Sequence, residues 1–130
     1  MIHAAAAVIA SLLLAGAAQG AETPASPVLM MKDLLAAPGK EVRVLSLTSA
    51  PGAASAAHRH NAQVFVYLVS GSMIMQVKGQ PPVTLLPGQT FYEAPTDIHV
   101  VSRNASQTEP AKFLVFMILD KGAPVSVGAE

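Results

Sequence analysis

Short segments rich in β-branched and aromatic residues, separated by glycine and proline turns every 8–12 residues, are the feature that most constrains the fold. They show no helical periodicity long enough to predict an amphipathic helix. This spacing predicts an all-β sandwich or barrel. About eight strands are expected, although the first segment also fits a single helical turn: 28–35, 41–49, 63–70, 72–78, 83–86, 89–94, 98–103 and 112–120.

The first twenty residues, MIHAAAAVIASLLLAGAAQG, have the pattern of a secretory signal peptide. An apolar centre from Ala4 to Leu14 is followed by small residues, and Ala18-Gln19-Gly20 fits a cleavage site before Ala21. The apolar run is shorter than the ~20 residues that a membrane span needs. An uncleaved N-terminal anchor is the alternative. In both cases we expect the rest of the chain outside the cytoplasm, periplasmic or secreted, and free of the membrane after cleavage.

The remaining residues have the size of one small domain, about 110 residues. We expect the following organisation: signal peptide 1–20, N-terminal leader and first strand 21–39, β domain 40–120, and an irregular C-terminal tail 121–130. The turn signal at Ser70-Gly71, between two strand-like segments, predicts a tight hairpin.

Charge and cysteine content exclude several classes of function. Eight Lys and Arg residues balance eight Asp and Glu residues, so no basic surface is available to neutralise phosphates, and we expect no nucleic-acid partner. The chain has no cysteine, which excludes disulfides, thiolate metal sites and cysteine nucleophiles.

Three of the four histidines remain after signal removal, and two of them are one residue apart. His58 and His60 would point to the same face of a strand, since side chains alternate along it. A closed sheet would let His99 meet this pair. Three imidazoles on rigid strands suit a divalent metal such as Zn, Fe, Cu, Ni or Mn. The alternative is a pair of solvated histidines at the end of a surface strand.

The segment around the first two histidines resembles the first motif of the cupin family. It reads Gly52-x5-His58-x-His60-x10-Gly71, where the family has G-x5-H-x-H-x3,4-E-x6-G. The main departure is the glutamate. Its position falls on Val64 with the three-residue spacing and on Phe65 with the four-residue spacing, and neither residue can bind a metal.

A second segment resembles the second cupin motif, G-x5-P-x-G-x2-H-x3-N. It reads Gly88-x6-Pro95-x-Asp97-x-His99. Together the two resemblances cover roughly residues 40–120. They imply a double-stranded β-helix, or jelly-roll barrel, that is usually a homodimer and holds a metal or a small ligand in its mouth.

The resemblance implies that three histidines are ligands of one divalent transition metal: His58, His60 and His99. Without the carboxylate the metal would be more electrophilic and more weakly bound. The resemblance therefore leaves two functions open: a metal-dependent enzyme such as a dioxygenase or isomerase acting on a small molecule, or a cupin that binds a sugar or phenolic ligand without metal. A degenerate scaffold without a site is a third alternative.

Glu93 and Tyr92, which precede His99 in the sequence, are candidates for catalysis. Glu93, if it points inward, would be a general acid or base or would orient a histidine. The phenol of Tyr92 would offer a hydrogen bond. By alternation the two side chains lie on opposite faces, and the sequence leaves open which face is inside. Asp97 is expected to accept a hydrogen bond in the preceding turn.

Overall fold

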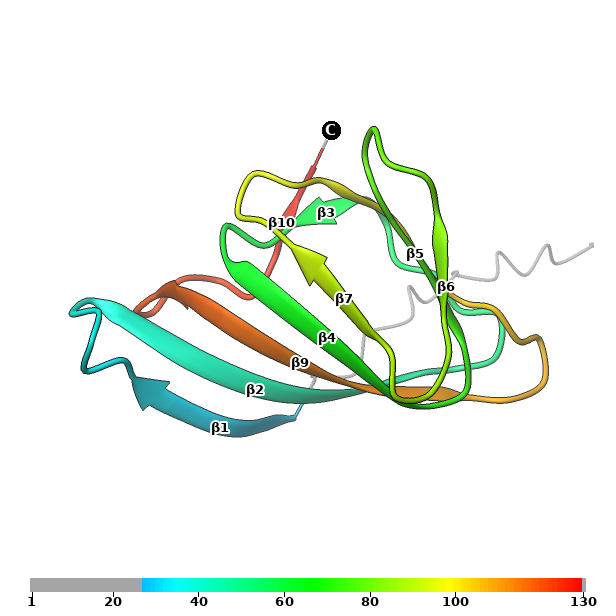
Figure 1. Cartoon of the computed structure of the whole chain (residues 1–130), viewed down its shortest axis with the longest axis horizontal. Helices are drawn as coiled ribbons and strands as arrows, with labels where there is room; N and C mark the ends of the chain where they lie inside the picture. Colours follow the sequence, from blue (N-terminus) through cyan, green and yellow to red (C-terminus); the bar gives the residue numbers. More distant parts are fainter. Residues whose placement is uncertain (1–26, 130) are drawn as a thin grey trace, which may run out of the picture.

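The computed structural model describes residues 27–129, and these form two five-stranded antiparallel sheets facing each other (Figure 1). The all-β prediction is confirmed. The first sheet has the order β1 (Val28–Asp33), β2 (Lys40–Ser49), β9 (Ala111–Asp120), β4 (Gln63–Ser70), β7 (Thr90–Glu93). The second has the order β10 (Val127–Gly128), β3 (His58–Arg59), β8 (His99–Asn104), β5 (Met73–Val77), β6 (Val83–Leu85).

The hydrophobic core lies between the two sheets. Burial alternates along β4 and β9, the two central strands that pair in the first sheet. Each therefore presents one face to the core, as half-buried antiparallel strands do. The second sheet contributes Met73 and Met75, each 1% exposed. The most deeply buried core residues of the first sheet are Val64, Leu68, Ala111, Met117 and Leu119.

The chain crosses from one sheet to the other at Gly71, so the predicted hairpin at Ser70-Gly71 is wrong. β4 ends at Ser70 in the first sheet and β5 begins at Met73 in the second. Gly71 has φ +78°, and a Cβ there would lie 2.6 Å from the carbonyl oxygen of Pro110. A turn signal predicts where the chain reverses but does not reveal whether the flanking strands pair.

The C-terminal tail is more ordered than the sequence indicates. It turns back from the end of β9, and β10 pairs with β3 beside the expected histidine pair (Figure 1). The segment at 28–35, which fitted either a strand or a helical turn, forms β1 at the edge of the first sheet. The predicted signal peptide lies outside the described residues. Within residues 27–129 there is no helix of the length and apolarity that crossing a membrane requires.

Candidate metal centre

Three histidines from the second sheet converge inside the barrel. His58 in β3 is paired with His99 in β8, and His60 follows one residue after β3 ends. One ligand nitrogen from each lies within 4.8 Å of the others. Asn61, with φ 49°, then turns the chain towards β4, in a conformation that asparagine tolerates better than most residues.

Backbone carbonyls determine which nitrogen two of these rings offer. Nδ1 of His58 lies 2.8 Å from the carbonyl oxygen of Ala56, and Nδ1 of His60 lies 2.7 Å from that of Val125. A carbonyl only accepts hydrogen bonds, so each Nδ1 carries the proton and donates it. Each Nε2 is left with a free lone pair, which is the form that binds a metal.

Glu93 is the carboxylate nearest to these rings, and it comes from the other sheet. Its residue is 2% exposed, and it pairs with Val64 across β7 and β4. Its Oε1 lies 3.2 Å from Nδ1 of His99, and its Oε2 lies 3.7 Å from Nε2 of His60. The carboxylate is therefore inside the barrel, between two of the three histidines.

Several buried polar atoms in this cluster have no hydrogen-bond partner among residues 27–129: Oε2 of Glu93 and both ring nitrogens of His99. Buried polar groups are almost always paired, and a set of unpaired donors and acceptors calls for a bound species. Three imidazoles and a carboxylate are ligands of the type that zinc and first-row transition metals use. The residues present therefore fit a divalent metal.

Burial also favours the metal-binding form of His58. Its removal from water lowers the pKa of His58 below the ordinary value of 6.5, and the neighbouring His60 and His99 act in the same direction. The hydrogen bond to Ala56 and the charge of Glu93 oppose this shift but do not cancel it. His58 is thus neutral at pH 7, as a ligand must be.

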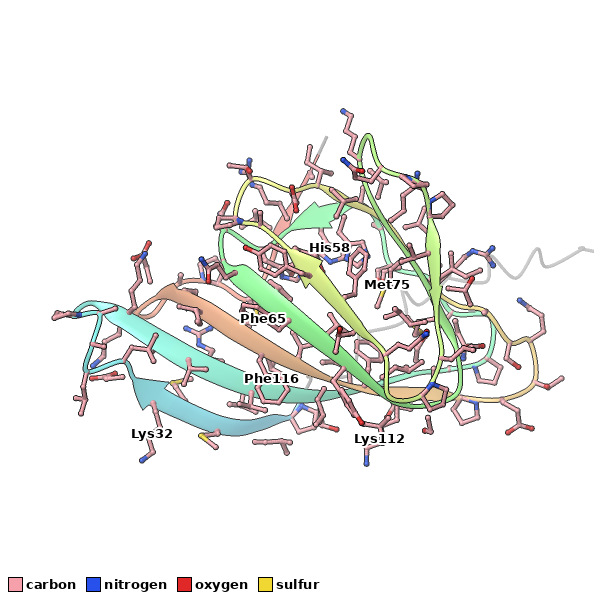
Figure 2. The ribbon with its side chains drawn as sticks, viewed as in Figure 1. Lys32, His58, Phe65, Met75, Lys112 and Phe116 are labelled. Atoms are coloured by element: carbon pink, nitrogen blue, oxygen red, sulfur yellow. The ribbon has the colours of Figure 1, made fainter. Side chains whose placement is uncertain are left out.

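The histidines open onto a cavity of about 100 Å³ between the sheets. This is several times the space that one ordered water needs. Figure 2 shows His58 and Met75 facing the interior. Apart from the three histidines and Glu93, the lining is mostly aliphatic and aromatic, with Ser55 and Ser102 as the hydroxyl groups: Leu45, Leu47, Val64, Val66, Met75, Phe113, Val115 and Val125.

The structure does not bring Tyr92 to this cavity. Tyr92 is 47% exposed on the outer face of β7, where its ring lies 5.2 Å from that of Phe65. Asp97 serves the turn, since its Oδ2 accepts a hydrogen bond from the amide of Ala94 at 2.7 Å. Sequence reasoning missed Val125, because the tail carries no strand pattern that would place it near the histidines.

Comparison with known proteins agrees with this architecture. The solved structures that resemble the chain include a conserved protein with a double-stranded beta-helix domain from Klebsiella pneumoniae, with a TM-score of 0.61 and 21% identity, covering 85% of this chain and 88% of that one. The DMSP lyase DddQ from Ruegeria pomeroyi has a TM-score of 0.57 and 20% identity, over 72% of this chain and 44% of the lyase.

A salicylate 1,2-dioxygenase from Pseudaminobacter salicylatoxidans has a TM-score of 0.53 and 19% identity, over 58% of this chain and 21% of the dioxygenase. The chain thus spans less than half the length of both enzymes. At these identities the likeness shows the fold alone. No curated protein matches the sequence.

The family assignment rests on the sequence itself. Residues 45–117 match the Cupin domain family, and this stretch is more than half of the chain. It contains the histidine pair, the crossing at Gly71 and His99. The chain therefore belongs to the cupin family.

Proposed function

We propose that this protein is an exported cupin that holds one divalent transition metal with His58, His60 and His99 and acts on a small molecule, as an oxygenase or isomerase would. The observation that carries the proposal is the convergence of the three rings, two of which have Nδ1 held by a backbone carbonyl so that Nε2 is free.

A bound metal would supply Lewis acidity, and with iron, copper or manganese also redox chemistry, next to the cavity. The chain itself supplies the surroundings. Apolar walls exclude water, and Ser55 and Ser102 are the hydroxyl groups in the lining that can orient a polar part of the substrate. We therefore expect a substrate with a small, mainly apolar body and one or two polar groups.

The second candidate is a cupin that binds a small phenolic or sugar ligand without metal. It is favoured by Val64, which stands where the family places a metal-binding glutamate and is 1% exposed inside the barrel. The predominance of apolar side chains in the cavity suits a phenolic ring better than a sugar.

Metal content separates the two candidates. The mature protein is purified without chelator and analysed for iron, manganese, zinc, nickel and copper, beside the His99→Ala and Arg59→Ala variants. Arg59 lies between the two histidines but is exposed, so it is a matched control. About one metal per chain in the wild type and in Arg59→Ala, but not in His99→Ala, supports the metal-dependent function. No metal in any of them, even after each ion is added back, favours the ligand-binding alternative.

We also propose that the mature protein is periplasmic or secreted, supported by the apolar N-terminal segment and the cleavage pattern before Ala21. Expression of the full chain in a Gram-negative host, followed by fractionation and N-terminal sequencing, tests this. A soluble periplasmic product that begins at Ala21 supports export with cleavage. A membrane-bound product that retains Met1 supports an uncleaved anchor instead.

We further propose that a second copy of the chain covers the outer face of the first sheet. This face carries half-exposed aromatic side chains on three neighbouring strands: Phe65, Tyr67, Tyr92 and Phe116. Lys112 and Asp120 lie at opposite ends of β9 on the same face, so antiparallel stacking of two copies would bring Lys112 of one copy towards the ion pair of Asp120 with Lys40 in the other. A dimer in sedimentation experiments that becomes a monomer in Phe116→Lys supports this, and a wild-type monomer contradicts it.

A further inference from the structure

Glu93 faces the position at which this chain has lost the family's glutamate. Glu93 in β7 and Val64 in β4 are direct partners in an antiparallel pair. Side chains of such partners point to the same face, with Cβ atoms about 4.5–5.5 Å apart. Both side chains are almost completely buried in the barrel. The carboxylate is therefore still present at this point of the barrel wall, on the neighbouring strand.

The separation of Glu93 and His60 is compatible with two ligands of one ion. Nδ1 of His60 donates a hydrogen bond to the carbonyl oxygen of Val125, so Nε2 is the nitrogen available to a metal. This Nε2 lies 3.7 Å from Oε2 of Glu93, which is buried and has no hydrogen-bond partner among residues 27–129. A metal ion bound by both atoms would give the buried oxygen the partner that it lacks.

The contact between Glu93 and His99 is also close without being a hydrogen bond. Oε1 lies 3.2 Å from Nδ1 of His99, yet within the described residues this nitrogen makes no hydrogen bond of acceptable geometry. Two ligands that each bind a zinc ion at 2.0–2.2 Å in a tetrahedral arrangement lie about 3.4 Å from each other. The separation of Oε1 from His99 and that of Oε2 from His60, 3.2 Å and 3.7 Å, lie on either side of this value, each for a different oxygen of the carboxylate.

We propose that Glu93 is the fourth ligand of the metal, so that the carboxylate of the site has moved from β4 to β7 while the three histidines have stayed. This inference rests on the proposed metal-binding function and deepens it. It assigns Glu93 a place among the ligands in preference to the roles of proton carrier or support for a histidine. The site then has one negative ligand, despite Val64.

The test measures the affinity for Zn²⁺, by competition with a chromophoric chelator, and the visible spectrum of the Co²⁺-loaded protein. The variants are Glu93→Gln, which keeps the shape, Glu93→Val, and the exchange Val64→Glu with Glu93→Val, which returns the carboxylate to β4. Tyr92→Phe is the control, because Tyr92 is adjacent but lies on the outer face.

We expect Glu93→Gln to weaken Zn²⁺ binding by more than about 100-fold, which exceeds the 10–100-fold cost of losing an outer partner, and to change the Co²⁺ spectrum. We expect the exchange variant to bind at least ten times more tightly than Glu93→Val. A Co²⁺ spectrum of Glu93→Gln identical to that of the wild type, with affinity within about threefold, would overturn the assignment of Glu93 alone. A wild type that binds neither ion would overturn the metal site itself.

Discussion

Nδ1 of His60 donates a hydrogen bond to the carbonyl oxygen of Val125, 65 residues further along the chain. This bond joins the tail to the candidate metal centre, and β10 next to it pairs with β3. Val125 also contributes to the cavity wall. The last turn of the chain is thus a part of the site, although it follows the final long strand.

We expect truncation after Asp120 to weaken metal binding about 10–100-fold, the usual cost of losing an outer partner of a ligand. Without Val125, Nδ1 of His60 no longer has its acceptor, and the ring can rotate. Zinc titration of the truncated protein measures the effect, with removal of residues 129–130 as the control. Equal affinity in the two proteins would show that the tail does not support His60.

Metal binding is expected to depend on pH with a definite sign. Burial lowers the pKa of His58 below 6.5, so protons do not compete for this ligand until the pH falls below 6.5. Titrations with Co²⁺ at pH 7.5 and 5.5 should show weaker binding at the lower value.

The lowered pKa of His58 also predicts how the stability of the metal-free protein depends on pH. Because the folded pKa of His58 is lower than the unfolded one, the unfolded chain binds more protons below pH 6.5. The free energy of unfolding should therefore decrease as the pH falls from 6.5 through the folded pKa. Urea denaturation of the wild type and His58→Gln measures this, and an identical pH dependence in both would contradict it.

Substitution of Asn104 by alanine should destabilise the protein by about 2–4 kcal/mol. The residue is 1% exposed, and its Nδ2 donates to the carbonyl oxygens of Ser49, Ala50 and Glu109, while its Oδ1 accepts from the amide of Ser106. Alanine would remove all four hydrogen bonds and leave these backbone groups without their partner. Thermal unfolding should show a decrease in Tm of roughly 4–8 °C per kcal/mol.

Substitutions of Gly71 and Gly79, which have similar φ, distinguish the cost of backbone strain from that of steric overlap. Gly71 and Gly79 have φ +78° and +85°, but an added Cβ meets Pro110 and Ala111 only at Gly71, with nothing within 4 Å at Gly79. We expect Gly79→Ala to cost about 1–2 kcal/mol and Gly71→Ala at least about twice as much. Equal losses in denaturant unfolding would show that the overlap relaxes freely.

The convergence of the histidines could be predicted because two simple rules determine it. Alternation along a strand places His58 and His60 on one face, and closure of an all-β chain brings His99 towards them. The inward direction of Glu93 could not be predicted. Alternation places Glu93 and Tyr92 on opposite faces of β7. Which of the two faces the core depends on the pairing of β7 with β4, and the local sequence does not reveal this pairing.

The residues of the cavity wall could also be predicted only in part. Strand parity divides nine large side chains of the barrel strands among the interior, the edge of the core and the outer face. Met75 and Phe113 line the cavity, and Met73 and Met117 are buried in the core, while Phe91 packs against the core at its edge. The other four lie on the outer face: Phe65, Tyr67, Tyr92 and Phe116. β3 and β10 were also missed, because two residues are too few to show a periodicity.

The origin of the ligands from different sheets has a mechanical consequence. All three histidines belong to the second sheet or its loop, whereas Glu93 lies at the end of a strand in the first. An ion bound by the three histidines and Glu93 would link the two sheets. Its binding energy would oppose their separation at the end of the sandwich where these ligands lie. Loading with metal would then slow hydrogen exchange on β7 as well as on β8, and the rigidity of the barrel mouth would follow the metal supply of the compartment.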